Sequence, residues 1–218
     1  MDRALSNRGF VTPLRGLLVV LSGPSGVGKG TVVTHAMSGR TQAARRLRRS
    51  VSVTTRRPRP DEQEGSHYFF RSQDEFDRMV AADELLEWAT YLDHRYGTPR
   101  EWLDQQLAAG CDAVLEIEVQ GAMQVRPRRP EAVLIYMLPP SWEALRQRLK
   151  RRRSEDADLQ QRRIEVARQE LCFLPQYDYV IVNDRVAAAA GSFLAILQAE
   201  RSRITRLDLS AVLEETSE

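Results

Sequence analysis

Residues 17–31, LLVVLSGPSGVGKGT, decide the fold of this chain. The first five residues form an unbroken apolar run, which is typical of a strand buried on both faces. Gly23, Gly28 and Lys29 then follow the spacing of the phosphate-loop pattern G-x-x-x-x-G-K-[ST]. Residues 31–37 have the composition of a helix. A strand, a glycine-rich loop and a helix in this order predict a P-loop that binds a nucleoside triphosphate.

The glycines and the lysine of this loop have separate tasks. Glycine residues, Gly26 among them, let successive backbone N–H groups point at phosphate oxygens, while Lys29 reaches the β- and γ-phosphates. Gly30 departs from the pattern, because Ser or Thr usually stands there and binds Mg²⁺. The hydroxyl comes one place later, on Thr31. We therefore expect Mg²⁺ to be held mainly by phosphates, by water and by acids elsewhere in the chain.

The rest of the chain alternates between apolar runs and stretches with helical spacing. The predicted strands cover residues 50–55, 67–70, 113–119, 133–138 and 179–182, and the predicted helices cover residues 31–37, 74–86, 101–109, 141–148, 159–171 and 186–203. Strands that alternate with helices predict an α/β fold, a P-loop NTPase core with a mostly parallel sheet between helices.

Composition excludes several classes of protein. The 218 residues carry 32 Lys and Arg against 30 acids, and a net charge of +2 argues against a general nucleic-acid coat. Cys111 and Cys172 form no CxxC pair, which indicates free thiols in a reducing compartment. No apolar run reaches the roughly 18 residues of a membrane helix, and the polar N-terminus lacks the features of a secretory signal. We expect a cytoplasmic protein with no membrane partner and no stable nucleic-acid partner.

A second phosphate site is predicted in the segment after the first helix. Ser52, Arg56, Arg59 and Tyr68 combine two guanidinium groups, three residues apart, with two hydroxyls. Such a set is a good receptor for a dianionic phosphate. The alternative interpretation, a solvated basic turn, is the commoner one for such a sequence taken alone.

The following segment offers groups that distinguish purine bases. Glu87 is a carboxylate that can accept hydrogen bonds from N1–H and N2–H of guanine, and a hydroxyl of Tyr96 or Thr98 can donate to O6. Adenine has the opposite polarity at N1, so this combination favours guanine. Each of these residues taken alone is weak evidence.

Five stretches together resemble the guanylate kinase family, which transfers the γ-phosphate of ATP to GMP. They are the P-loop, SVSVTTRRPR (residues 50–59), EWATYLDHRYGT (87–98), EIEVQGA (116–122) and VIVND (180–184), and the likeness extends over residues 17–197. The resemblance implies a small mixed α/β GMP-binding subdomain and a helical lid beside the P-loop core. The implied organisation is one domain (16–205) between an N-terminal tail (1–15) and a C-terminal tail (206–218). Within the domain, the core covers residues 16–49, 99–140 and 172–205, the GMP-binding subdomain covers 50–98, and the lid covers 141–171.

The resemblance also assigns roles to individual residues. The implied ATP site comprises Gly23, Ser25, Gly26, Val27, Gly28, Lys29, Gly30, Thr31, Asn183 and Asp184, the last two beside the adenine. The implied GMP site comprises Ser52, Arg56, Arg59, Tyr68, Glu87, Tyr96, Thr98 and Glu118. The implied catalytic residues are Lys29, Arg59, Arg152 and Arg163, and of these Arg152 and Arg163, joined by Arg59, would close over the transferred phosphate. The implied Mg²⁺ ligands are Thr31 and Glu116. The substrates would be ATP and GMP, with dGMP as a further expected acceptor.

Three clusters of charge leave alternatives open. Glu116 and Glu118 stand two apart in a predicted strand, so both are expected on one face of it; an exposed edge strand is the alternative. Many members of the family have aspartates there. In the lid, Arg153 replaces a frequent glycine, so Arg152 and Arg153 can exchange roles. The run at residues 45–49, RRLRR, is interpreted as a solvated basic stretch, with loose RNA binding as the alternative.

Two other functions compete with the kinase. A non-catalytic module of the same fold would use the GMP cleft for a protein partner, but such modules typically lose the loop lysine, which this chain keeps as Lys29. A P-loop GTPase would have no use for a second nucleotide pocket. ADP formation from ATP that requires GMP distinguishes the three. The sequence leaves open whether the protein is a monomer or a homo-oligomer.

Overall fold

The computed structural model describes residues 12–13, 15–91, 93–150 and 157–210. Its core is a five-stranded parallel sheet with the strand order β10-β9-β2-β8-β3. The strands are β2 (Leu18–Ser22), β3 (Leu47–Arg49), β8 (Asp112–Glu116), β9 (Val133–Leu138) and β10 (Tyr179–Val182). The predicted P-loop α/β class is confirmed.

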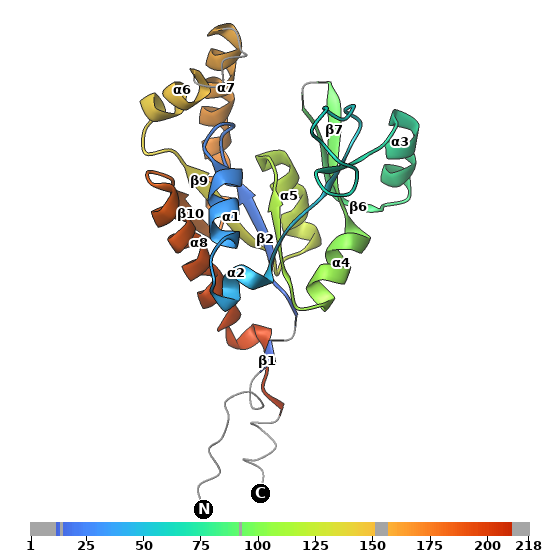
Figure 1. Cartoon of the computed structure of the whole chain (residues 1–218), viewed down its shortest axis with the longest axis vertical. Helices are drawn as coiled ribbons and strands as arrows, with labels where there is room; N and C mark the ends of the chain where they lie inside the picture. The colour runs from blue at the N-terminus through green and yellow to red at the C-terminus, as the bar shows by residue number, and fades with distance from the viewer. Residues whose placement is uncertain (1–11, 14, 92, 151–156, 211–218) are drawn as a thin grey trace, which may run out of the picture.

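Helices cover both faces of this sheet (Figure 1). The helices α1 (Lys29–Met37) and α8 (Val186–Arg201) cover one face, and α4 (Arg100–Ala108) and α5 (Val119–Arg128) cover the other. Val19 in β2 packs in the core beneath α1 and α8, whereas its neighbours Leu18 and Val20 pack in the core beneath α4 and α5. Because side chains alternate along a strand, the apolar run of β2 fills both layers.

A second, four-stranded sheet has the order β5-β4-β7-β6. It consists of β4 (Ser52–Thr54), β5 (Tyr68–Phe70), β6 (Leu85–Tyr91) and β7 (His94–Pro99), and α3 (Gln73–Ala81) packs beside it. The pair β4 and β5 is parallel, while β7 is antiparallel to both β4 and β6. The helix predicted at 74–86 is wrong at its end, because Leu85 and Leu86 belong to β6. Asp83, with φ of 55°, lies in the turn between α3 and β6.

The segment after β8 also differs from the prediction. β8 ends at Glu116, and Glu118 is the N-cap of α5, which the sequence did not indicate. The expectation that Glu116 and Glu118 project from one strand face is therefore wrong. The exposed-edge alternative is wrong as well, since β8 lies between β2 and β3.

Two further strands correct the sequence interpretation. The apolar run at 179–182 favours a buried strand, but β10 is an edge strand in which Val180 and Val182 are about half exposed, at 50% and 52%. The basic run at 45–49 was not assigned to any element, yet it forms the end of the short helix α2 (Gln42–Arg46) and the edge strand β3.

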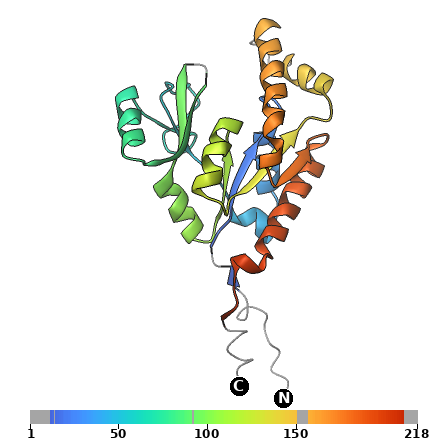
Figure 2. The ribbon, with the colours of Figure 1, turned by 180° about the vertical axis from the view of Figure 1, so that it is seen from behind.

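The lid residues form a separate helical layer. The helices α6 (Trp142–Lys150) and α7 (Ala157–Glu170) enclose a small core of Leu145, Leu149, Ile164 and Ala167. The 3₁₀ segment η1 (Leu171–Gln176) leads from α7 to β10. In both views, α6 and α7 lie above one side of the core sheet and the four-stranded sheet lies above the other (Figures 1 and 2).

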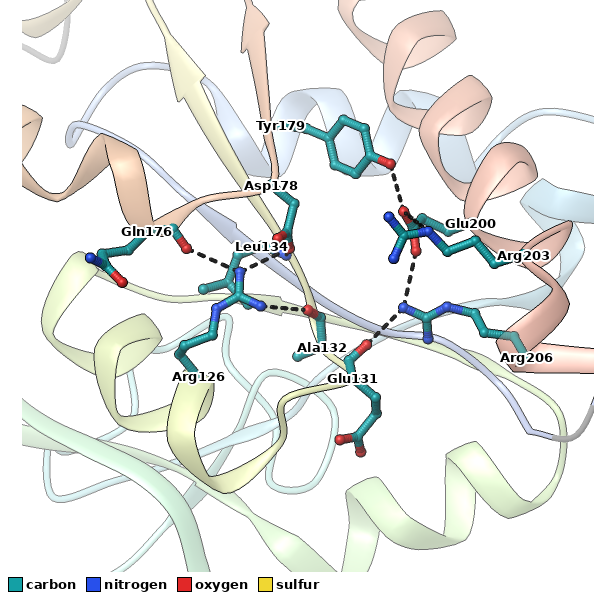
Figure 3. Close-up of polar contacts among 10 residues, drawn as sticks. All are labelled: Arg126, Glu131, Ala132, Leu134, Gln176, Asp178, Tyr179, Glu200, Arg203 and Arg206. Carbon is teal, nitrogen blue, oxygen red and sulfur yellow. Dashed lines mark hydrogen bonds and ion pairs between the residues drawn. The ribbon is translucent and has the colours of Figure 1, made fainter.

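The two ends of the described chain meet at the opposite edge of the sheet. The strands β1 (Thr12–Pro13) and β11 (Leu207–Asp208) form an antiparallel pair, preceded by the 3₁₀ turn η2 (Ile204–Arg206). Nearby, the carboxylate of buried Glu200 accepts hydrogen bonds from Tyr179 and Arg206 and lies 3.2 Å from Arg203 (Figure 3). None of the helices in the described ranges is long and apolar enough to cross a membrane.

Candidate active site

A cavity of about 490 Å³ lies at the carboxyl ends of the core strands and extends to the second sheet. The predicted site residues that line it are Ser25, Gly26, Gly28, Lys29, Gly30, Thr31, Ser52, Tyr68, Glu116 and Glu118. The lining also includes Pro24, Arg49, Ser50, Ser66 and His67, which the sequence did not indicate. The P-loop and part of the expected GMP site therefore share one cavity.

The P-loop connects β2 directly to α1. Gly23, Gly26 and Gly28 have φ angles of 145°, 83° and 100°, in a region that side chains rarely adopt. These angles turn the chain so that α1 begins at Lys29 with its first residues lining the cavity. The free N–H groups and the positive dipole end of a helix favour an anion there. The Lys29 Nζ donates to the Gly23 carbonyl at 2.5 Å, so a bound phosphate would compete for this ammonium.

Two side chains from elsewhere in the fold brace the loop. The buried Asn183 donates from Nδ2 to the Val27 carbonyl at 2.8 Å, and Arg148 of α6 donates to the same carbonyl at 2.9 Å. Arg148 also donates to the Asn183 carbonyl at 2.8 Å. Asn183 thus contacts the loop itself, whereas exposed Asp184 does not line the cavity. Arg148 opens the basic stretch RLKRRR (residues 148–153), in which the sequence alone does not distinguish one arginine from the next.

An ion pair occupies the expected metal side of the loop. Glu116 lies 2.7 Å from the Nε of Arg49, whose Nη2 donates to the Gly30 carbonyl at 2.9 Å. A Cβ added at Gly30 would lie 3.3 Å from Glu116 Oε2, so a side chain at position 30 would contact the carboxylate. Burial raises the pKa of Glu116, while Arg49 and Lys29 oppose that shift. Arg49 was missed because its role depends on β3 lying beside β8.

The donor set fits a magnesium ion bound mostly through nucleotide phosphates. Glu116, Glu118 and the Thr31 hydroxyl offer the hard oxygen ligands that Mg²⁺ prefers, and all three line the same cavity as Lys29. Among the described residues, no three His, Cys, Asp or Glu side chains are grouped as a metal site. A dedicated protein cage is therefore absent from this part of the chain.

The arginines of the expected GMP-phosphate site are organised by Glu62. Arg56 donates to both oxygens of Glu62, at 2.7 and 2.9 Å, and Glu62 also accepts from the Arg59 backbone N–H at 2.8 Å. These contacts lower the pKa of Glu62 to about 2. The Arg56 guanidinium lies 5.4 Å from the ring centroid of Tyr68, which contacts Tyr96 edge-on. Glu62 was missed because it lies in the charged turn PDEQEG, where acids are usually solvated.

The two residues expected to select guanine, Glu87 and Thr98, are hydrogen-bonded to each other and buried. The Thr98 hydroxyl donates to Glu87 Oε1 at 2.7 Å, and the two residues are 0% and 3% exposed. Burial raises the pKa of Glu87 to about 7, against the opposing effect of the Thr98 hydrogen bonds. A Cβ at Gly121 would lie 2.4 Å from Glu87 Oε2, so glycine in α5 makes room for this carboxylate. Arg56, Arg59, Glu87, Tyr96 and Thr98 do not belong to the lining of the 490 Å³ cavity.

The lid reaches the P-loop through Arg163. Its Nη1 donates to the Ser25 hydroxyl at 3.1 Å, so α7 contacts the loop directly. The other expected lid arginine, Arg152, and its alternative, Arg153, lie outside the described residues. The structure therefore places one of the two expected lid arginines, Arg163, beside the P-loop.

Comparisons with known proteins agree with this geometry. The guanylate kinase family model matches residues 15–200. The guanylate kinase of Desulfitobacterium hafniense is 46% identical over 88% of this chain and 94% of its own length, and that of Synechococcus sp. is 50% identical over 84% and 82%. The crystal structure of guanylate kinase from Anaplasma phagocytophilum, 32% identical, superposes with a TM-score of 0.74 over 94% of this chain and 96% of its own. The chain therefore belongs to the guanylate kinase family of ATP:GMP phosphotransferases.

Proposed function

We propose that this protein transfers the γ-phosphate of ATP to GMP, giving ADP and GDP, and that dGMP is a second acceptor. One observation supports this most directly. The same cavity is lined by Lys29 of the P-loop and by Ser52 and Tyr68 of the second sheet. A phosphate donor on the loop and a phosphate acceptor on the sheet would thus meet in one cavity.

The acceptor side would recognise GMP at both ends. Its phosphate would meet Ser52, Tyr68 and the Arg56 guanidinium, and the phosphate would compete with Glu62 for that arginine. Its base would meet Glu87, whose ionised carboxylate accepts from the N1–H and N2–H of guanine. Adenine has no N1–H, so AMP would leave the buried carboxylate with no donor from the base, which is unfavourable.

The donor side would stabilise charge during transfer. Phosphoryl transfer depends mainly on positioning and on positive charge around the transferred group. Lys29 would exchange its contact with the Gly23 carbonyl for the β- and γ-phosphates, and Arg163 would approach from α7 beside Ser25. The acceptor is a phosphate oxygen that is already ionised at pH 7, so a general base is unnecessary.

Magnesium would accompany ATP. Thr31 and Glu116 would hold it together with the phosphates, and it would supply charge neutralisation on the transferred group. Arg49 holds Glu116 in the unliganded arrangement, so this carboxylate is kept in position by its ion pair.

The setting is proposed as cytoplasmic purine nucleotide recycling. Cys111 and Cys172 are both free thiols, which supports a reducing compartment. The lid and the second sheet lie on opposite sides of the cavity end of the core sheet (Figure 1). Their approach on binding would align the two phosphates and exclude water that hydrolyses ATP.

A coupled assay of ADP formation tests the proposal. ADP should form from ATP when GMP is added, and neither without an acceptor nor with AMP at the same concentration. Lys29→Ala should abolish the GMP-dependent reaction, and Lys150→Ala, which removes an exposed lysine of α6, is the matched control that should retain it. Nucleotide hydrolysis that does not depend on GMP would indicate a hydrolase. GMP binding without any turnover would indicate a binding module.

A further inference from the structure

Two smaller cavities lie at the opposite edge of the core sheet, where the strands begin. In one of them, of about 240 Å³, each lining arginine meets a carboxylate (Figure 3). Arg126 lies 2.9 Å from Asp178, and Arg203 and Arg206 lie 3.2 and 3.0 Å from the two oxygens of Glu200. This network is neutralised within the protein and serves to fasten the end of α8 to the sheet.

The other cavity, of about 390 Å³, differs in its charge. It is lined by Arg15, Arg45, Arg46, Arg48 and Arg201, together with Ala108, Ala109, Gly110 and Cys111, and none of the described residues in its lining carries a carboxylate. We call it the basic cavity. The five arginines come from four separate segments, namely the approach to β2, the end of α2, β3 and the end of α8. The fold therefore gathers charges that are dispersed in the sequence.

Most of these arginines have no acidic partner within the part of the chain that the structure describes. Arg201 is the exception, since it pairs with buried Asp112, but its Nη1 is itself buried with no hydrogen-bond acceptor among the described residues. Among the described residues, Arg48 donates to two backbone carbonyls, those of Arg45 and Leu47. Within the described ranges, the side chains of Arg15, Arg45 and Arg46 have neither a hydrogen bond nor an ion pair.

Helix ends offset part of this charge. The cavity adjoins the C-termini of α2, α4 and α8, and each C-terminus contributes roughly half a negative charge. Asp112 adds one more negative charge through its pair with Arg201. Against five guanidinium groups, these contributions leave an excess of about two to three positive charges. Dipole compensation alone thus does not account for the number of arginines.

We propose that the basic cavity binds a free small ligand with two or more adjacent phosphate groups. The charge of a diphosphate or triphosphate matches the positive excess, and guanidinium forks bind phosphate oxygens in pairs. A hollow of this volume is within the range of small-molecule sites. A nucleic acid would instead be expected to follow an extended basic surface. Inorganic polyphosphate and the phosphate chain of a nucleotide share this chemistry.

Cys111 provides a local reporter of binding. It lines the basic cavity and is partly exposed, while exposed Cys172 lies in η1 at a different place in the fold. Cys172→Ser leaves Cys111 as the single thiol in the chain. Tripolyphosphate should slow the alkylation of this thiol by neutral iodoacetamide at least fivefold. Adding Arg15→Gln and Arg45→Gln, both exposed positions, should remove the protection.

A matched control removes equal charge elsewhere. Arg78→Gln with Arg162→Gln, exposed positions on α3 and α7, should leave the protection intact. ADP in place of tripolyphosphate separates the two sources, because protection by ADP assigns a nucleotide and protection by tripolyphosphate alone assigns inorganic polyphosphate. Unchanged alkylation with either compound would overturn the proposal, as would equal protection in both double variants. Protection by a short single-stranded RNA alone would also overturn it, in favour of a nucleic-acid surface.

Discussion

Replacing Glu87 with Gln tests the central feature of the acceptor site. Glu87 is 3% exposed, and burial raises its pKa from 4.5 to about 7. A carboxyl group with a raised pKa in the folded state destabilises the fold as pH rises from the unfolded value through the folded value. At 1.36 kcal/mol per pKa unit, the full effect above pH 7 is about 3 kcal/mol. Glutamine carries no charge and still accepts from Thr98, so Glu87→Gln removes this penalty.

The expected result is a stability difference that depends on pH. Relative to the native protein, Glu87→Gln should gain about 2.5 kcal/mol in the free energy of unfolding between pH 5 and pH 8. Urea unfolding at several pH values, without nucleotide, measures this gain. Glu116 and Glu170 also have raised pKa values, but they are present in both proteins and cancel. Glu84→Gln, at an exposed position, is the control. A difference that stays constant over this pH range would refute the reasoning.

Glu87→Gln should lower activity toward GMP although it raises the stability of the fold. Guanine needs the ionised carboxylate, and hydrogen bonds to charged groups contribute about 1.5–3 kcal/mol each. Glu87→Gln should therefore raise the KM for GMP about 100-fold and weaken discrimination against AMP. In the native protein, GMP affinity should rise with pH up to about 7, and this rise should be absent in Glu87→Gln. The GMP phosphate titrates equally in both experiments, so the difference between the native protein and Glu87→Gln reports the titration of Glu87 alone.

Three further predictions concern single contacts. Gly121→Ala places a methyl group 2.4 Å from Glu87 Oε2, so the KM for GMP should rise at least 10-fold with little change in the KM for ATP, and an unchanged KM for GMP would contradict this geometry. Arg148→Ala removes donors to the Val27 and Asn183 carbonyls. It should lower the free energy of unfolding by roughly 2 kcal/mol and raise the KM for ATP. Arg146→Ala on the same helix is the control and should change neither quantity. Gly30→Ser brings a side chain beside Glu116 and should modestly shift the Mg²⁺ concentration that gives half-maximal activity. An unchanged Mg²⁺ titration would contradict a role for Glu116 in holding the metal.

Local sequence determined the parts of the fold that depend on nearby residues. The apolar run of β2 and the glycines of the P-loop predicted a buried strand followed by a phosphate loop, because burial on both faces and positive φ angles restrict residue types directly. The parallel α/β class followed from the alternation of elements. Family motifs then named Glu87 and Thr98 as a guanine pair, and the structure places them in a hydrogen bond.

Only the tertiary structure decided which charged residues act together. Arg49, Glu62 and Arg148 belong to charged stretches that look solvated, and their partners are brought to them by strand order and by lid packing. Glu116 and Glu118 belong to different elements, because β8 ends at Glu116 and α5 begins at Val119, where helix packing overrides the apolar alternation of a strand. Sequence patterns report burial and local conformation, whereas ion pairs depend on distances between segments. For that reason the sequence determined the phosphate loop and its family, and the fold alone determined the partners of its charges.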